Sequence, residues 1–366
     1  MQERLKYHFE PEKGWMNDPN GLCFFRGRYH AFFQHNPNNL FGGHISWGHT
    51  VSDDLIHWER LPDALLPDRP YEDFCGEEFG GCWSGSAVVK DDKLYLFYTS
   101  HSKALGQTQS MAVSSDGVHF DKYAGNPILL YPPVDGSADF RDPKVTKIDN
   151  TYYMVLGSGK NNVGKILLYR SEDLYGWDYV GVLLEGEEYG AVLECPDFFP
   201  FCGKYMLMFS KMNRPTYSTQ FIYGDFDGKT FTPITFHTPE AGPHLYAPQT
   251  FLDSRGRRII IGWMNDWVRK PAPDAVSFGA LTIPRELTML GGKLRNFPVE
   301  EASSLLTTED ELVEASETRL RIRTKAGEPE LCYTAEKIES VNILRDTGTI
   351  EVFVNQGEQS FTYWFI

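Results

Sequence analysis

Short apolar runs separated by glycine, aspartate and asparagine dominate the hydrophobic pattern of this chain. Five segments share one scheme, in which an apolar run, a polar turn and a second apolar run follow one another: FFRGRYHAFFQ, VVKDDKLYLFYTS, TKIDNTYYMVLGS, FPFCGKYMLMFS and FLDSRGRRIIIGW. Runs of this length, rich in aromatic and β-branched residues, are typical of β-hairpins. Because long segments with a 3.6-residue apolar period are scarce, the pattern predicts an all-β protein.

The five hairpins recur at nearly constant intervals. Their turn residues are Gly27, Asp92, Asn150, Gly203 and Gly256, separated by 65, 58, 53 and 53 positions. A second motif, an aspartate four residues before an aromatic residue, recurs in the gaps at Asp54, Asp116, Asp173 and Asp227. A period of this length indicates repeated structural units, and each unit has room for about four strands. The sequence therefore predicts a five-bladed β-propeller over residues 1–298.

The period also assigns a role to Asp18, which stands in the stretch NDPNG. Its neighbours are typical β-turn residues, so a turn is the simplest interpretation of the stretch alone. In a propeller, however, the first strand of each blade lines a central channel, where matching positions converge. Nine positions before the five turns lie Asp18, Trp83, Arg141, Glu194 and Ala247. A turn does not explain this recurrence of charge, with Asp142 next to Arg141, so we interpret Asp18, Asp142 and Glu194 as catalytic carboxylates.

Three carboxylates in one pocket point to acid–base chemistry. A neighbouring negative charge raises the pKa of the least solvated carboxyl group, so the protonation states are expected to split into an acid and a base. Cleavage of a glycosidic bond requires such a pair. We expect Arg141 to hold Asp142 ionised. Trp15, Trp47 and Trp83 have flat faces suited to sugar rings, and Trp263 is expected in the core.

The composition limits the classes of partner that this protein is expected to bind. The formal charge of −15 argues against nucleic acid. The chain has no run of about 18 apolar residues and no apolar stretch near residue 1, which predicts a cytoplasmic protein without a membrane span. The six cysteines lack zinc spacing and are expected to be free thiols: Cys23, Cys75, Cys82, Cys195, Cys202 and Cys332. No metal or cofactor is predicted, and the expected partner is a small carbohydrate.

Several ordered motifs resemble those of glycoside hydrolase family 32, which contains invertases, fructanases and sucrose-6-phosphate hydrolases. They are WMNDPNG at 15–21, WGH at 47–49, SGS at 84–86, FRDP at 140–143 and ECPD at 194–197. The resemblance implies a retaining mechanism through a covalent fructosyl intermediate. It implies that Asp18 is the nucleophile, Glu194 the general acid and base, and Asp142 the stabiliser of the transition state. The substrate-binding residues that it implies are Asn17, Gln34, Trp47, Trp83, Ser84 and Arg141.

The predicted activity is release of terminal β-D-fructofuranosyl units from sucrose or short fructo-oligosaccharides. Three alternatives remain open: a fructosyltransferase, a sucrose-6-phosphate hydrolase and an inactive sugar-binding propeller. A phosphorylated substrate would need cations, and the candidates on loops are Lys103, Lys160 and Arg214.

The sequence departs from the family in two places. GPHLYAPQ carries His244 where an acidic residue is expected, which bears on specificity for the leaving group. Residues 299–366 resemble the start and finish of the family's β-sandwich with the middle missing. About five strands are expected there, too few to close two sheets, so this shortened module should cover its apolar face against the propeller or a second subunit, as in a homodimer.

Overall fold

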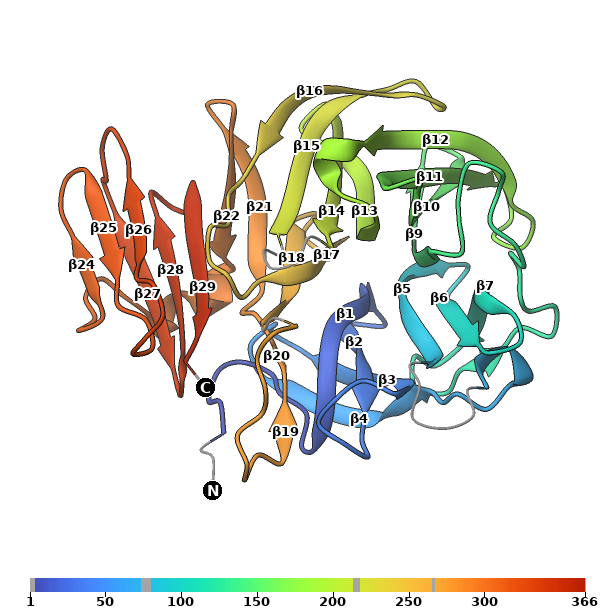
Figure 1. The fold of residues 1–366 in the computed structure, drawn as a ribbon, viewed down its shortest axis with the longest axis horizontal. Helices are drawn as coiled ribbons and strands as arrows, with labels where there is room; N and C mark the ends of the chain where they lie inside the picture. Colours follow the sequence, from blue (N-terminus) through green and yellow to red (C-terminus); the bar gives the residue numbers. More distant parts are fainter. Residues whose placement is uncertain (1–3, 74–79, 213–217, 265–266, 366) are drawn as a thin grey trace.

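Antiparallel strands joined by tight turns build almost the whole molecule, as the hydrophobic pattern predicts (Figure 1). The computed structural model describes residues 4–73, 80–212, 218–264 and 267–365. Five blades lie around a common centre, and two smaller sheets lie at one side of them. The fold is a five-bladed β-propeller followed by a shortened β-sandwich module. Within the described ranges, no helix is long and apolar enough to cross a membrane.

Each blade is a meander whose first strand lies nearest the centre. Blade 1 contains β1 (Gly14–Phe25), β2 (Arg28–Asn36), β3 (His44–Ser52) and β4 (Trp58–Leu65). Blade 2 contains β5 (Gly80–Lys90), β6 (Lys93–Ser102), β7 (Gly106–Ser114) and β8 (Asp121–Lys122). Blade 3 contains β9 (Phe140–Ile148), β10 (Thr151–Lys160), β11 (Val163–Ser171) and β12 (Asp178–Gly186). Blade 4 contains β13 (Leu193–Phe201), β14 (Lys204–Lys211), β15 (Ser218–Phe226) and β16 (Phe231–His237).

Blade 5 closes the ring. It contains β17 (Tyr246–Leu252), β18 (Arg258–Met264), β20 (Ala280–Leu281), β21 (Arg285–Leu290) and β22 (Lys293–Pro298). Between its strands the chain crosses to blade 1, where β19 (Ser277–Phe278) pairs in parallel with β1. Three short 3-10 helices connect strands: η1 (Pro70–Glu72), η2 (Glu187–Tyr189) and η3 (Glu300–Leu305). The predicted hairpin turns lie between the first two strands of the five blades, so the repeat assignment is confirmed.

The second repeated motif forms a turn stabilised by its aspartate. Asp54 Oδ1 accepts hydrogen bonds from the backbone N–H groups of Ile56 and His57, at 2.9 and 2.8 Å. The corresponding aspartates of blades 2, 3 and 4 make the same contacts two and three residues on. An Asp side chain that bonds its own downstream backbone holds the chain in a turn. The repeat therefore marks the connection from the third to the fourth strand.

A bulge interrupts the pairing of every inner strand. Two residues oppose one at Asn17–Asp18, Trp83–Ser84, Asp142–Pro143, Cys195–Pro196 and Ala247–Pro248. Bulges of this kind release residues from the ladder and redirect their side chains. The count of nine positions back from each turn does not reach equivalent places. β1 has a second bulge at Gly21–Leu22, and the paired stretch between bulge and turn is one residue longer in β5 than in β9. Arg141 and Glu194 precede their bulges, whereas Asp18 lies within one.

Hydrogen bonds across blades tie successive inner strands together. The backbone N–H of Gly85 donates to Asn20, that of Val145 to Ser86, that of Cys195 to Asp142 and that of Thr250 to Asp197, over 2.7–3.2 Å. Each side chain belongs to the inner strand of the preceding blade. Buried backbone groups freed by a bulge must find partners elsewhere, and here the next blade supplies them. The central channel is thus a connected polar network as well as an apolar core.

The C-terminal module corrects one prediction. It contains seven strands in two sheets: β23 (Leu306–Thr307), β27 (Val341–Asp346), β28 (Thr349–Val354) and β29 (Gln359–Trp364) in one, and β24 (Val313–Ala315), β25 (Arg319–Ile322) and β26 (Leu331–Thr334) in the other. Leu320 and Ile322 pack against Ile350 and Val352 across the two sheets. The expectation that this segment cannot close two sheets is wrong, because the strands at 306–315 add to both.

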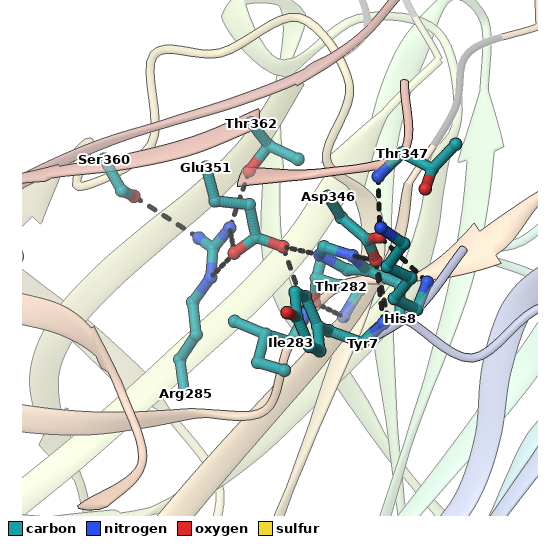
Figure 2. A network of polar contacts seen from close by, with 12 residues as sticks. Tyr7, His8, Thr282, Ile283, Arg285, Asp346, Thr347, Glu351, Ser360 and Thr362 are labelled. Atoms are coloured by element: carbon teal, nitrogen blue, oxygen red, sulfur yellow. Dashed lines mark hydrogen bonds and ion pairs between the residues drawn. The ribbon is translucent and has the colours of Figure 1, made fainter. Parts of the chain in front are cut away.

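The opposite face of the larger sheet docks on the propeller. Phe353 joins the core of blades 1 and 5, and Glu351 is fully buried between His8 and Arg285 (Figure 2). His8 lies 2.9 Å from both Asp346 and Glu351. Burial alone would lower the pKa of His8, but hydrogen bonds to these two carboxylates outweigh it and raise the pKa to about 9. A buried, charged histidine therefore connects the N-terminal segment to the module.

We expect His8→Ala to destabilise the protein at pH 7. A raised pKa means that the contribution of His8 is fully present below its unfolded pKa of about 6.5 and is lost as the pH rises through about 9. The loss is about 3 kcal/mol at most, which follows from the difference between an unfolded pKa of 6.5 and a folded pKa of about 9. Thermal unfolding from pH 6 to 10 checks this, and the difference should shrink above pH 9. His57→Ala, which changes an exposed histidine bonded to Asp54, is the control.

Candidate active site

The bulged inner strands surround a cavity of about 380 Å³. Its lining consists of Asn17, Asp18, Gln34, Trp83, Gln107, Asp139, Arg141, Asp142, Glu194, Met212 and Trp267. Strands β1, β9 and β13 each contribute one of the three predicted carboxylates, which are far apart in sequence. Asp18 and Asp142 lie in bulges and Glu194 directly precedes one, and all three side chains line the same cavity, so the cluster inferred from the repeat is present.

The two oxygens of Asp18 have different surroundings. Oδ2 accepts hydrogen bonds from Gln34 Nε2 at 3.0 Å and from Ser84 Oγ at 2.6 Å, and the Cys195 thiol lies at 3.3 Å. Oδ1 has no hydrogen-bond partner among the residues that the structure describes. Because donors crowd one oxygen only, the other is available to react.

Burial dominates the electrostatics of the cluster. It raises the pKa of Asp18 to about 7, with a further contribution from the charge of Asp142. Burial likewise raises the pKa of Asp142 to about 6, although Arg141 acts in the opposite direction. Arg141 thus favours the ionised form of Asp142, as expected from the sequence, although the loss of solvation has the larger effect on its pKa. At pH 7, a pKa of about 7 leaves Asp18 partly protonated, whereas a pKa of about 6 leaves Asp142 mostly ionised.

Arg141 contacts Glu194 instead. Its Nε and Nη2 atoms lie 3.2 and 3.0 Å from Glu194 Oε1, and Nη1 donates to Asp139 at 2.7 Å. The Tyr246 hydroxyl donates to Glu194 Oε2. Both oxygens of Glu194 are thus fixed by side chains from neighbouring blades. Sequence reasoning missed Tyr246, since the count from the fifth turn ended one residue further on.

The predicted binding residues divide into two groups. Asn17, Gln34, Trp83 and Arg141 line the cavity. Ser84 is fully buried and holds Asp18.

Trp47 does not meet the expectation of direct contact with sugar. Its side chain is fully buried, packs against Phe32 and Tyr98, and donates to the carbonyl oxygen of Trp83 at 2.8 Å. The indole of Trp47 supports the backbone of a cavity residue, because its position on β3 places it behind the inner strand.

Four cavity residues were not predicted from the sequence: Gln107, Asp139, Met212 and Trp267. Gln107 and Asp139 both accept from Arg141. Trp267 is 38% exposed, and its ring centroid lies 5.9 Å from that of Trp15 and 5.1 Å from that of Trp263. Trp15, which was expected to offer its face to a sugar ring, is buried and does not line the cavity, and Trp263 is buried as expected. The GWMNDW stretch at 262–267 was the available signal for Trp267.

His244 lies away from the cavity. It is buried, and its Nδ1 accepts a hydrogen bond from the backbone N–H of Trp364 at 2.9 Å. Its ring packs against Tyr363, with centroids 4.9 Å apart. The side chain of His244 therefore contacts the C-terminal sheet and does not line the cavity.

A propeller that gathers four carboxylates and two tryptophans in one cavity is typical of proteins that bind and cleave carbohydrates. The family model "Glycosyl hydrolases family 32 N-terminal domain" matches residues 8–298. A sucrose-6-phosphate hydrolase of Escherichia coli is 42% identical over 324 residues, covering 82% of this chain and 65% of its own length. A raffinose invertase of Escherichia coli is 40% identical and covers the same shares.

Comparison with solved structures points to the same family. A Bombyx mori GH32 β-fructofuranosidase matches with a TM-score of 0.87 and 31% identity, covering 99% of this chain and 89% of that one. A variant of that protein solved in complex with sucrose has a TM-score of 0.86. The chain belongs to glycoside hydrolase family 32. It spans about 65% of the length of the curated relatives named above.

Proposed function

We propose that this protein is a retaining glycosidase that releases terminal β-D-fructofuranosyl units from sucrose or short fructo-oligosaccharides. The observation that carries the proposal is the meeting of Asp18, Asp142 and Glu194 in one cavity. Membership of family 32 supports the fructosyl specificity. The test is fructose release from a panel of sucrose, sucrose 6-phosphate, kestose, inulin and levan, and failure on every substrate would refute the proposal.

We propose a separate role for each carboxylate. Asp18 Oδ1 attacks the anomeric carbon of the fructosyl unit and forms an ester bond, while the bond from that carbon to the leaving oxygen breaks. Glu194 gives its proton to that oxygen and then takes a proton from water, which cleaves the ester. Asp142 accepts hydrogen bonds from fructose hydroxyls. Gln34, Ser84 and Cys195 hold Oδ2 of Asp18 and so orient Oδ1.

Trp267 is placed to contact the leaving group. Its partly exposed ring and Met212 line the cavity alongside the catalytic carboxylates, where an aromatic face suits the C–H surface of a second sugar. We expect Trp267→Ala to raise KM for sucrose about tenfold with little change in kcat, because the contact is the same in the ground and transition states. Steady-state kinetics checks this. Tyr131→Ala, at a position 71% exposed and outside the cavity lining, is the control.

The cavity favours an unphosphorylated substrate. Of the described residues that line it, Arg141 is the one cation and it is bound to Glu194 and Asp139. Four carboxylates share the same lining, so a phosphate would meet net negative charge. Lys160 bonds the carbonyl oxygen of Val134, Lys103 is not in the lining, and Arg214 lies outside the described residues. Comparison of kcat/KM for sucrose and sucrose 6-phosphate decides this.

Transfer to a second sugar uses the same intermediate and is the second candidate. Sustained kestose-type products with little free fructose at high sucrose would favour it over hydrolysis. An inactive sugar-binding propeller ranks last, because the three carboxylates and the contacts that orient them are intact. We place the boundary between the catalytic domain (1–298) and the shortened module (299–366) after β22.

The cysteines bear on the cellular location of the protein, and its apolar surfaces bear on its oligomeric state. The described cysteines are free thiols, Cys75 lying outside the described residues, and this supports a reducing, cytoplasmic location. The apolar faces that motivated a homodimer are covered within the chain, by the second sheet of the module and by the propeller. Dimerisation stays a prediction, which sedimentation over a range of concentrations tests.

A further inference from the structure

A buried ion pair joins two inner strands just past the catalytic residues. Lys144 follows Asp142 by two positions on β9, and Asp197 follows Glu194 by three on β13. Lys144 Nζ lies 3.1 Å from Asp197 Oδ2, with side chains 7% and 0% exposed. Neither residue lines the cavity, and the chemistry proposed above does not use them.

The pair also reaches a third inner strand. Lys144 Nζ donates to the carbonyl oxygen of Thr250 at 2.6 Å. Asp197 Oδ2 accepts from the backbone N–H of Thr250 at 2.7 Å and from its hydroxyl at 2.8 Å. Strands β9, β13 and β17 are therefore fastened to one another at a single level, and these strands carry Asp142, Glu194 and Tyr246.

The bulges explain why such a fastening is needed. In β9 the ladder to β10 stops at Lys144 and resumes at Arg141, and in β13 the ladder to β14 stops at Asp197 and resumes at Glu194. The residues between them include Pro143 and Pro196, which have no N–H to donate. The bulge takes Asp142 out of the ladder of its own blade, and in β13 it begins directly after Glu194, so the residues at the far end of each bulge, Lys144 and Asp197, help to set where the catalytic stretch lies.

A buried ion pair is not explained by stability alone. Taking two charges out of water costs free energy that their attraction offsets only in part, and apolar replacements are often neutral. Burial lowers the pKa of Lys144, against the attraction of Asp197, which shows the same cost. Arg258 also faces Asp197, so the cluster has two cations and one carboxylate. Removal of Lys144 leaves one cation and one carboxylate, whose charges cancel.

We propose that the Lys144–Asp197 pair is a positioning device that sets the separation of Asp142 and Glu194 by fastening β9 to β13 and β17. The inference rests on the proposed glycosidase function. Misplacement of catalytic groups by about 1 Å can cost roughly a hundredfold in rate, whereas substrate binding depends on more of the cavity. Loss of the pair should therefore lower kcat and leave KM for sucrose nearly unchanged.

The test is Lys144→Met, with kinetics on sucrose and thermal unfolding measured on the same preparation. We expect kcat to fall about tenfold to a hundredfold and KM to stay within about threefold. Tm should fall in this variant and in the control variant below alike, because each removes one partner of a buried ion pair. Lys122→Met is the matched control, because Lys122 is also a buried lysine paired with a carboxylate, Glu72, outside the cavity. Its kcat should equal that of the wild type.

The proposal is overturned if Lys144→Met keeps the kcat of the wild type. It is also overturned if Lys122→Met loses as much kcat as Lys144→Met does. If Lys144→Met does not fold, Asp197→Asn decides, since it keeps the shape and the bonds from Thr250: lowered kcat at constant KM supports the proposal and unchanged kcat overturns it. A wild type that releases no fructose refutes the glycosidase function instead, so the two failures are distinguishable.

Discussion

Asp18→Asn should abolish fructose release and, at the same time, make the protein more stable at pH 8. The nucleophile is lost, so kcat should fall by about 10⁴-fold or more, as expected when a covalent catalyst is removed. The amide has the shape of the carboxylate, and its oxygen can keep the bonds from Gln34 and Ser84. Its nitrogen then occupies the place of Oδ1, which lacks a partner in the described structure.

The stability gain follows from the raised pKa of Asp18. Burial and the charge of Asp142 raise the pKa of Asp18 from 3.8 to about 7. Ionising Asp18 therefore costs more free energy in the folded protein than in the unfolded chain. The shift of roughly three units corresponds to about 4 kcal/mol. The stability lost by ionising Asp18 is zero below the unfolded pKa of that residue, grows as the pH rises, and reaches its full value above about pH 7.

Thermal unfolding from pH 4 to 8 checks this prediction. The Tm of Asp18→Asn should match that of the wild type near pH 4 and exceed it at pH 8. In the wild type, kcat/KM should decline below about pH 7, because Asp18 must be ionised to attack. Asp92→Asn, which changes an exposed aspartate in a hairpin turn, is the control. Equal Tm values at pH 8 would contradict the electrostatic argument.

Glu194→Gln should remove proton transfer while leaving the nucleophile in place. For sucrose, whose leaving group needs a proton, kcat should fall about 10²–10⁴-fold. Glutamine is matched in shape, so it can still accept from Arg141 or Tyr246. A fructoside with a nitrophenyl leaving group needs little protonation, and its first step should be much less affected. The fructosyl ester on Asp18 should then accumulate and be visible by mass spectrometry.

Two outcomes separate the roles of the carboxylates. Rescue of Glu194→Gln by azide, with a fructosyl azide as the product, would confirm that Asp18 attacks and Glu194 activates water. An equal loss on sucrose and on the nitrophenyl fructoside would show that Glu194 is not the acid. Glu188→Gln alters a carboxylate in η2 outside the cavity and should have wild-type kinetics.

Cross-blade contacts explain why the site tolerates so much buried charge. Asp142 accepts from the backbone N–H of Cys195, and Arg141 spans the gap to Glu194. These contacts exist only when the blades are assembled, so the folded ring holds like charges near one another. Removing a carboxylate relieves that repulsion at the expense of reactivity, which is the physical basis of the expected gain in Asp18→Asn.

The sequence by itself determined the strands, the five-fold repeat and the three carboxylates, because each depends on local properties: apolar alternation, turn residues such as Gly27, and short motifs around Asp18, Asp142 and Glu194. Tertiary structure alone decided that Arg141 binds Glu194, that Trp47 is buried and that Trp267 lines the cavity. It also decided that Oδ1 of Asp18 has no hydrogen-bond partner among the described residues. The reason is that bulges shift the register within each inner strand and neighbouring blades supply the partners. A residue's hydrogen bonds and burial then depend on strands more than 50 positions away, as between Arg141 and Glu194, which no local pattern encodes.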